Sequence, residues 1–286
     1  MGPEAICEGY ARQVLELDRV ALGAAFGSHP LRLRHLLAGA RGFTIEDIVE
    51  LSGQLAARTM QGTKARVPLL TPRGVPTYTD DVAELAQRIG SSDGRIGMLF
   101  LQRFPRYREV LDTILQQVFD TVGTPEGPPD RLDTSIFLAA PGAVVPVHFD
   151  SHHNLLLQLE GTKEIVLGAF ADEDAQARAL EVGCRSGKRM ADVVPPITAR
   201  FHLGPGDGLY IPPYMFHWVT GGPETSAALS CSFSTAPTLR AEVVHAWNSR
   251  LRRVGLRPRP PGRSARRDRA KVTAMRALIR ARSRRP

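Results

Sequence analysis

A short apolar stretch of the sequence holds several side chains that can bind a metal ion. Residues 145–165 read VPVHFDSHHNLLLQLEGTKEI, in which three histidines, an aspartate and an asparagine interrupt a run of aliphatic residues. Burying this many polar groups is costly unless each one finds a partner. Because residues two apart on a β-strand point to the same face, His148 and Asp150 present a nitrogen and an oxygen donor side by side.

A His-x-Asp pair is a weak signal by itself and needs a third ligand. His217, which follows the turn-rich segment GPGDGLYIPPYMF, is the candidate. Two imidazoles and one carboxylate leave open positions around a metal, which suits a non-haem Fe(II) that must bind a cosubstrate and O₂ together. A structural zinc site would be closed by four ligands, usually including thiolates. The three cysteines (Cys7, Cys184, Cys231) are far apart in the sequence and are expected to be free thiols.

A lysine beyond a glycine turn is a candidate anchor for an anionic cosubstrate. Fe(II) oxygenases of this kind oxidise 2-oxoglutarate, whose distal carboxylate needs a cationic partner. Lys163 follows Gly161 at the start of the next expected strand; an isolated lysine there is more often a solvated side chain. An arginine after the second histidine would be the alternative anchor, but residues 218–239 contain no Arg or Lys. That absence favours Lys163.

The elements that position these side chains are short strands. From about Thr134 to residue 234, β-rich runs alternate with turn residues, a spacing that indicates an antiparallel sandwich or barrel. Upstream, the sequence reads mainly as helical, and TIEDIVELSGQLAAR opens with Thr44 and Asp47 in capping-box positions. A buried strand is expected over 96–102 and a further helix over 106–123. We predict a mainly β fold with flanking helices, divided into a helical N-terminal region (1–95), a β-rich domain (96–237), a C-terminal helix (238–255) and a basic tail (256–286).

The positive charge is concentrated at one end of the chain. The formal net charge is +8, yet residues 250–286 contain 15 Arg and Lys with Asp268 as the single acid. The other 249 residues carry 22 basic and 28 acidic side chains, a net charge of −6. The tail has three interpretations: a solvated segment, a nucleic-acid contact, or a part of a homodimer interface, for which the helix over 238–255 is the better candidate.

Membrane insertion and secretion are not expected. The longest apolar runs are far too short to cross a bilayer. The N-terminal residues MGPEAICEGYARQ include acids and lack the charged-then-apolar pattern of a signal peptide. We therefore expect a cytoplasmic protein.

The motifs together resemble those of the JmjC-type, cupin-fold 2-oxoglutarate oxygenases, especially the asparaginyl hydroxylase of hypoxia-inducible factor. The resemblance rests on the HFD triplet that begins at His148, on Asn154 and Lys163 six and fifteen residues later, and on GPGDGLYIPPYMFH, which ends at His217. It implies that His148, Asp150 and His217 bind Fe(II), that Lys163 binds the distal carboxylate of 2-oxoglutarate, and that Asn154 lies near the metal-bound end of that cosubstrate.

The resemblance covers about half of the chain and implies a double-stranded β-helix that hydroxylates an unactivated C–H. The expected substrate, again by resemblance, is an amino-acid side chain in a peptide or protein. Two alternatives stay open: an oxygenase that modifies tRNA or another RNA through the basic tail, and a non-catalytic, metal-binding cupin-like regulatory protein.

Three positions depart from the pattern of that hydroxylase. Val145 replaces a threonine, Phe100 aligns with a tyrosine that bonds the distal carboxylate, and Ser232 replaces a second asparagine. Each lost hydrogen bond to a charged group costs about 1.5–3 kcal/mol. Either the affinity for the cosubstrate is therefore lower, or Thr134, Ser230 or Ser232 compensates within the cosubstrate pocket.

Overall fold

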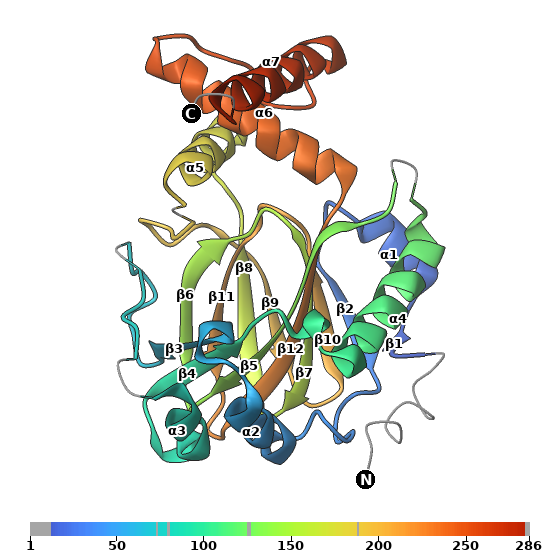
Figure 1. Cartoon of the computed structure of the whole chain (residues 1–286), viewed down its shortest axis with the longest axis vertical. Helices are drawn as coiled ribbons and strands as arrows, with labels where there is room; N and C mark the ends of the chain where they lie inside the picture. Colours follow the sequence, from blue (N-terminus) through green and yellow to red (C-terminus); the bar gives the residue numbers. More distant parts are fainter. Residues whose placement is uncertain (1–12, 73, 79–80, 125–126, 188, 284–286) are drawn as a thin grey trace.

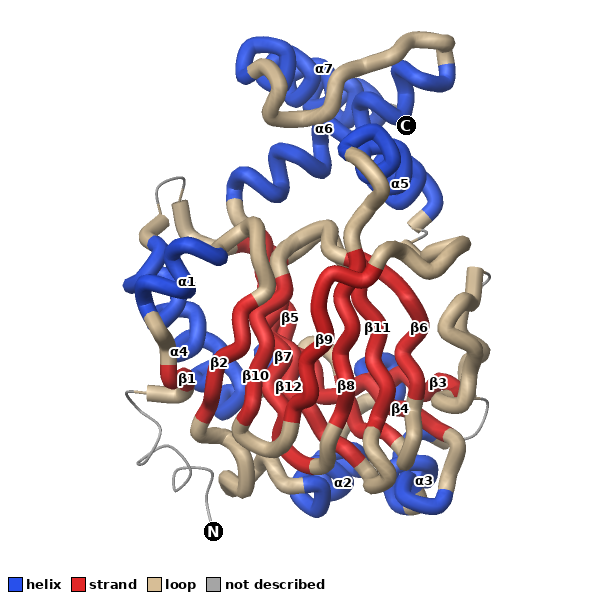
Figure 2. Tube along the Cα trace, turned by 180° about the vertical axis from the view of Figure 1, so that it is seen from behind, coloured by secondary structure: helices blue, strands red, loops and turns tan. Residues whose placement is uncertain are grey.

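The computed structural model describes residues 13–72, 74–78, 81–124, 127–187 and 189–283. Its centre is a pair of antiparallel sheets that face each other (Figures 1 and 2). The strand order is β1-β2-β10-β7-β12-β5-β4-β3 in the larger sheet and β6-β11-β8-β9 in the smaller one. The strands are β1 (Leu15–Glu16), β2 (Leu31–His35), β3 (Met60–Lys64), β4 (Gly94–Met98), β5 (Asp130–Ala139), β6 (Val144–Phe149), β7 (His153–Glu160), β8 (Lys163–Gly168), β9 (Ile197–Leu203), β10 (Asp207–Ile211), β11 (Phe216–Gly221) and β12 (Ser226–Ser234).

The order of the strands defines a double-stranded β-helix. From β5 to β12 the chain passes repeatedly between the two sheets, so that β5, β7, β10 and β12 form one wall and β6, β8, β9 and β11 form the other. Each strand turns one face toward the space between the walls, as alternation requires. The predicted mainly β fold with flanking helices is confirmed.

Seven helices lie outside the two walls in the described part of the chain. They are α1 (Arg19–Ala25), α2 (Ile45–Gln54), α3 (Val82–Gln87), α4 (Pro105–Val122), α5 (Glu173–Ser186), α6 (Ala236–Arg253) and α7 (Ala265–Ser283). Thr44 and Asp47 form the expected capping box of α2, and α4 and α6 closely match the helices expected there. None of the described helices is long and apolar enough to cross a membrane.

The N-terminal region, expected to be helical, also supplies strands to the larger sheet. The apolar spacing of residues 4–26 is typical of a helix; residues 4–12 lie outside the described part, and the rest forms β1 and the short α1. The sequence LRLRH alternates apolar and basic residues, which is the period of a half-buried strand, and it forms β2 against β10. The expected strand over 96–102 is β4, which begins at Gly94 and ends at Met98.

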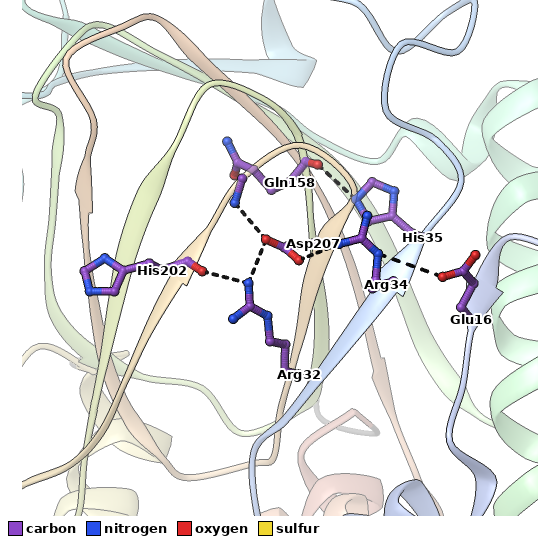
Figure 3. Close-up of polar contacts among 8 residues, drawn as sticks. Glu16, Arg32, Arg34, His35, Gln158, His202 and Asp207 are labelled. Atoms are coloured by element: carbon purple, nitrogen blue, oxygen red, sulfur yellow. Dashed lines mark hydrogen bonds and ion pairs between the residues drawn. The ribbon is translucent and has the colours of Figure 1, made fainter.

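Polar contacts hold β2 at the margin of the barrel (Figure 3). The Asp207 carboxylate accepts hydrogen bonds from Arg32 Nη2 at 2.8 Å and Arg34 Nη1 at 3.2 Å. Beneath them, the buried His35 ring contacts the carbonyl oxygen of Gln158 on β7 at 2.9 Å. The two arginines are more than half exposed, so these ion pairs set the register of β2 more than they stabilise the protein.

The C-terminal helices form a layer at one end of the barrel (Figures 1 and 2). Helix α6 begins directly after β12 and packs against both α5 and α7. The buried Glu181 of α5 accepts a hydrogen bond from Arg252 of α6 at 2.5 Å, and Met275 of α7 is 5% exposed. The tail therefore includes a helix that packs against α6, while most of its described side chains are exposed. Self-association through the C-terminal helix stays a prediction.

The turn that precedes Lys163 requires glycine for two reasons. Gly161 has a φ of +67°, and a Cβ there would lie 2.4 Å from the backbone oxygen of Thr225. Gly142 has nearly the same φ, +68°, but no atom lies within 4 Å of the equivalent Cβ position. The two positions thus differ only in the space around them.

We expect Gly161→Ala to lower the free energy of unfolding more than Gly142→Ala does. Both changes add about 1–2 kcal/mol of backbone strain, whereas the first also forces about 1–3 kcal/mol of steric displacement. Chemical denaturation of the two variants measures the difference. Equal losses in the free energy of unfolding would show that the turn at Gly161 accommodates the added Cβ without steric cost.

Candidate metal centre and anion pocket

The pairing of two neighbouring strands brings three candidate ligands together. His148 lies near the end of β6 and His217 near the start of β11, and the two residues are direct partners in the antiparallel register. Asp150 follows β6 immediately. Its Oδ2 lies 4.0 Å from His148 Nε2 and 3.7 Å from His217 Nε2. The three ligand atoms all lie within 4.8 Å of one another, which is the geometry of a metal site.

Backbone carbonyl groups orient both imidazoles in the same way. His148 Nδ1 lies 2.8 Å from the carbonyl oxygen of Pro146, and His217 Nδ1 lies 3.1 Å from that of Met215. A proton on each Nδ1 satisfies these contacts and leaves each Nε2 lone pair directed toward Asp150. Such hydrogen bonds fix the tautomer of metal-binding histidines.

The charges around Asp150 keep the ligands in the form that binds a cation. Burial opposes its ionisation, but His148, His152, His217 and Arg189 together lower the pKa of Asp150 to about 2. Burial, followed by the proximity of His217, lowers the pKa of His148 to about 4. At neutral pH the cluster therefore offers a carboxylate and a neutral imidazole. Two nitrogens and one oxygen with open positions suit Fe(II).

A cavity of about 340 Å³ extends from this cluster into the barrel. Two cations line it: Lys163 at the start of β8 and Arg95 on β4, whose guanidinium lies 4.5 Å from the ring centroid of Phe137. Among the described residues, no carboxylate forms an ion pair with either one. Burial and then the charge of Arg95 lower the pKa of Lys163 to about 7, and burial lowers the pKa of Arg95 to about 10.

The buried Lys163 and the partly buried Arg95 favour a bound anion. A charge taken out of water is costly unless it is paired, and both cations line the cavity that also holds the metal ligands. A dicarboxylate that reaches the metal with one end and the cations with the other satisfies both requirements. The cavity volume is at the small end of the range for ligand sites, about 300–1,000 Å³. The residues present thus fit both Fe(II) and 2-oxoglutarate.

Of the other residues predicted to contact the cosubstrate, Asn154 and Ser232 line the cavity and Thr134 does not. Asn154 accepts a hydrogen bond from Ser230 Oγ at 2.9 Å, and Ser232 is its register partner on β12. On β5, the residues at odd positions line the cavity, including Ser135. Thr134 points the opposite way, toward Cys231. The expectation for Thr134 is corrected, because the strand's alternation places it on the outer face.

Two of the departures from the hydroxylase pattern have clear structural positions. Val145 lines the cavity as an apolar wall. Phe100 lies beyond the end of β4, is 38% exposed, has a φ of +61° and is not part of the cavity lining. Arg95 and Leu99 are the residues of this segment that line the cavity, and Arg95 is the charged one. Sequence analysis missed it because the expected strand began at Ile96; an arginine just before a buried apolar run was the available signal.

An antiparallel double-stranded β-helix with a His-x-Asp pair and a distant histidine at its strand ends is the architecture of JmjC-type cupin domains. Residues 130–241 match the family model described as the JmjC domain. The matched segment contains the three candidate metal ligands and Lys163. The more specific resemblance to the asparaginyl hydroxylase stays a prediction.

Two curated relatives each match about a third of the chain. It is 34% identical over 104 residues to Jumonji C domain-containing protein 5 of Drosophila melanogaster, covering 33% of this chain and 26% of that protein. It is 30% identical over 119 residues to JmjC domain-containing protein D of Dictyostelium discoideum, covering 38% and 25%. The matches thus span about a quarter of the length of these relatives.

Solved structures resemble the whole fold. Escherichia coli YcfD superposes with a TM-score of 0.57 at 14% identity, covering 94% of this chain and 69% of that one. A second structure, described as YcfD, a ribosomal oxygenase, in complex with cobalt and 2-oxoglutarate, gives 0.53 at 14% identity, with 94% and 68% coverage. At this level of identity the likeness establishes the fold.

Asp150→Asn should lower the affinity for Co(II) or Fe(II) roughly 100-fold or more, since even residues that only orient the ligands contribute about 10–100-fold. Anaerobic titration calorimetry measures this. Asp133→Asn is the matched control, because Asp133 lines the same cavity outside the ligand cluster. Equal effects of the two substitutions would contradict the assignment.

Lys163→Met should raise the free energy of unfolding, because it removes a buried charge, and the gain should shrink as the pH rises. The folded-state pKa of about 7 lies below the ordinary value of 10.5, so the unfolded chain binds the extra proton between these values. Wild-type stability therefore rises with pH relative to the variant, by about 2 kcal/mol between pH 7 and pH 9.

Denaturation at the two pH values tests this, with Lys64→Met as the control at an ion-paired lysine whose side chain is 40% exposed. A gain that did not change with pH would show that Lys163 is not perturbed in the folded protein.

Proposed function

We propose that this chain is an Fe(II)- and 2-oxoglutarate-dependent oxygenase that hydroxylates an unactivated C–H of an amino-acid side chain in a peptide or protein. The observation that carries the proposal is one cavity that holds a His–Asp–His cluster, the buried Lys163 and the partly buried Arg95, two cations that pair with no acid among the described residues. When bound, Fe(II) would activate O₂, which is the oxidant: one of its oxygen atoms would enter succinate as 2-oxoglutarate is oxidised and loses CO₂, and the other would enter the substrate C–H bond.

The chain's own residues bind and orient the reactants. Lys163 and Arg95 fix the distal carboxylate, while the apolar walls, among them Val145, Leu156 and Ile211, keep water from the reacting atoms. Asn154, held by Ser230, supplies an amide beside the metal-bound end of the cosubstrate. Ser232 lies next to it and takes the place of the second asparagine. Positioning and exclusion of water are the contributions that a protein makes in such a site.

The comparisons support a protein as the substrate. The E. coli structures are described as those of a ribosomal oxygenase, and we extend this to the present chain with a ribosomal protein as the candidate substrate. Hydroxylation of tRNA or another RNA, and a regulatory protein that binds metal without turnover, are the competing proposals. Mass spectrometry after the reaction separates them. One added oxygen on a peptide supports the proposal, one on a nucleoside supports RNA modification, and no added oxygen supports the regulatory protein.

The first test is anaerobic binding of 2-oxoglutarate to the Fe(II)-loaded protein, followed by the visible metal-to-ligand charge-transfer absorption. The wild type should develop the band and Asp150→Asn should not. If iron binds but no band appears, the cavity does not accept this cosubstrate and the proposal fails.

In the same assay, Arg95→Met should weaken 2-oxoglutarate binding about 10–100-fold, as expected for the loss of a hydrogen bond to a charged group. Arg103→Met is the matched control. That guanidinium also stacks on a phenylalanine, 4.8 Å from the Phe100 ring centroid, but it does not line the cavity. Unchanged affinity in Arg95→Met would remove Arg95 from the cosubstrate site.

A further inference from the structure

Helix α7 carries arginines along one exposed face. Arg266, Arg269, Arg276 and Arg280 follow one another at intervals of three, seven and four residues, and all four are exposed. At 3.6 residues per turn they form one stripe about 21 Å long. The buried residues Asp268 and Met275 lie on the other side of the helix.

Tertiary contacts hold this face outward. The Asp268 carboxylate accepts a hydrogen bond from the backbone N–H of Gly262 at 2.7 Å, and Lys271 Nζ donates to the carbonyl oxygen of Arg259 at 2.9 Å. Met275 is buried, and α7 packs against α6 (Figures 1 and 2). The arginine stripe is therefore presented by a positioned helix.

Three of the four arginines have no acidic partner in the described part of the chain. No described residue forms an ion pair with Arg266, Arg269 or Arg276. The nearby acids are engaged elsewhere: Glu173 pairs with Arg263, Glu181 with Arg252, and Glu242 with Arg131. Like charges three or four residues apart destabilise a helix, so the stripe opposes folding unless it meets an anionic partner.

We propose that the exposed face of α7 binds the phosphate backbone of RNA. Residues 250–286 contain 14 Arg and one Lys, and guanidinium groups bind phosphate oxygens with two parallel hydrogen bonds. Because the other face of α7 is packed, the helix cannot enter a groove with its whole circumference. The helix recognises the charge and the spacing of the phosphates, and its contacts are independent of base sequence.

The layer that contains α7 adjoins the end of the barrel that holds the metal ligands. Glu242 of α6 accepts a hydrogen bond from Ser151 Oγ at 2.5 Å, next to Asp150, and also binds Arg131 of β5. RNA on α7 would lie at the same end of the molecule as the candidate metal centre. The choice of RNA over other polyanions rests on the proposed function, because a ribosomal protein substrate is surrounded by RNA.

The test is fluorescence anisotropy of a labelled single-stranded RNA of about 20 nucleotides with the full chain, without iron or 2-oxoglutarate, over about 50–200 mM salt. Two triple variants are compared: R266Q/R269Q/R276Q on α7 and R19Q/R41Q/R58Q, three exposed arginines of the N-terminal region. Each triple removes the same charge. Thermal melting of both establishes that they fold.

We expect the α7 triple to bind at least about 10-fold more weakly than the wild type, with a salt slope reduced by about 2 on the logarithmic scale, and the control triple to bind within about 2-fold of it. Equal losses in the two triples, no binding by the wild type, or stronger binding to polyglutamate would each overturn the proposal. The charge-transfer assay, repeated on the α7 triple, should be unchanged, so failure of RNA binding and failure of the oxygenase proposal are distinguished.

Discussion

The antiparallel pairing of β6 with β11 is the constraint on which the candidate site depends. It places two histidines that are 69 residues apart in the sequence directly opposite each other, and Asp150 follows one of them. The same pairing continues to β8, on the other side of β11, so Lys163 lies opposite Gly221. A slip of one residue would turn one histidine out of the cavity and separate the ligands.

The cavity places binding and stability in opposition. The apolar interior of the barrel, which includes Leu156, Leu167 and Leu209, would be more stable without charges beside it. Lys163 and Arg95 are retained there at a cost in free energy that a bound dicarboxylate relieves. Such buried, uncompensated groups are typical of ligand sites, where local stability is given up for affinity.

The sequence predicted the parts of the site that depend on local pattern. Strand alternation placed His148 with Asp150, and the turn-rich segment before His217 identified the third ligand. The local pattern was not enough to predict whether Arg95 and Thr134 reach the cavity. Arg95 depended on where β4 begins, and strand ends are the least certain feature of a pattern. Thr134 depended on which face of β5 meets the cavity, which is set by its register with β12.

Among the flanking helices, too, local sequence predicted some features, while tertiary contacts determine others. The capping box of α2 was recognisable because its two residues contact each other locally. Helix α5 was not anticipated. For α7, the spacing of Val272, Met275, Leu278 and Ile279 indicates a helix with one apolar stripe, but it does not indicate which elements the stripe packs against. The burial of Met275 and the inward position of Asp268 follow from contacts with α6 and the loop before α7.

The link from Glu242 to both Ser151 and Arg131 has a geometric consequence. It joins α6 to the connection between β6 and β7 and to strand β5, and α6 also continues directly from β12. The C-terminal layer is thereby fixed in position and orientation relative to the barrel, unlike an appendage on a flexible linker. Whatever docks on that layer is held at a constant offset from the cavity. A docked partner would then present to the cavity only a residue that lies at the matching distance from its docking point, even where several of its residues are chemically equivalent.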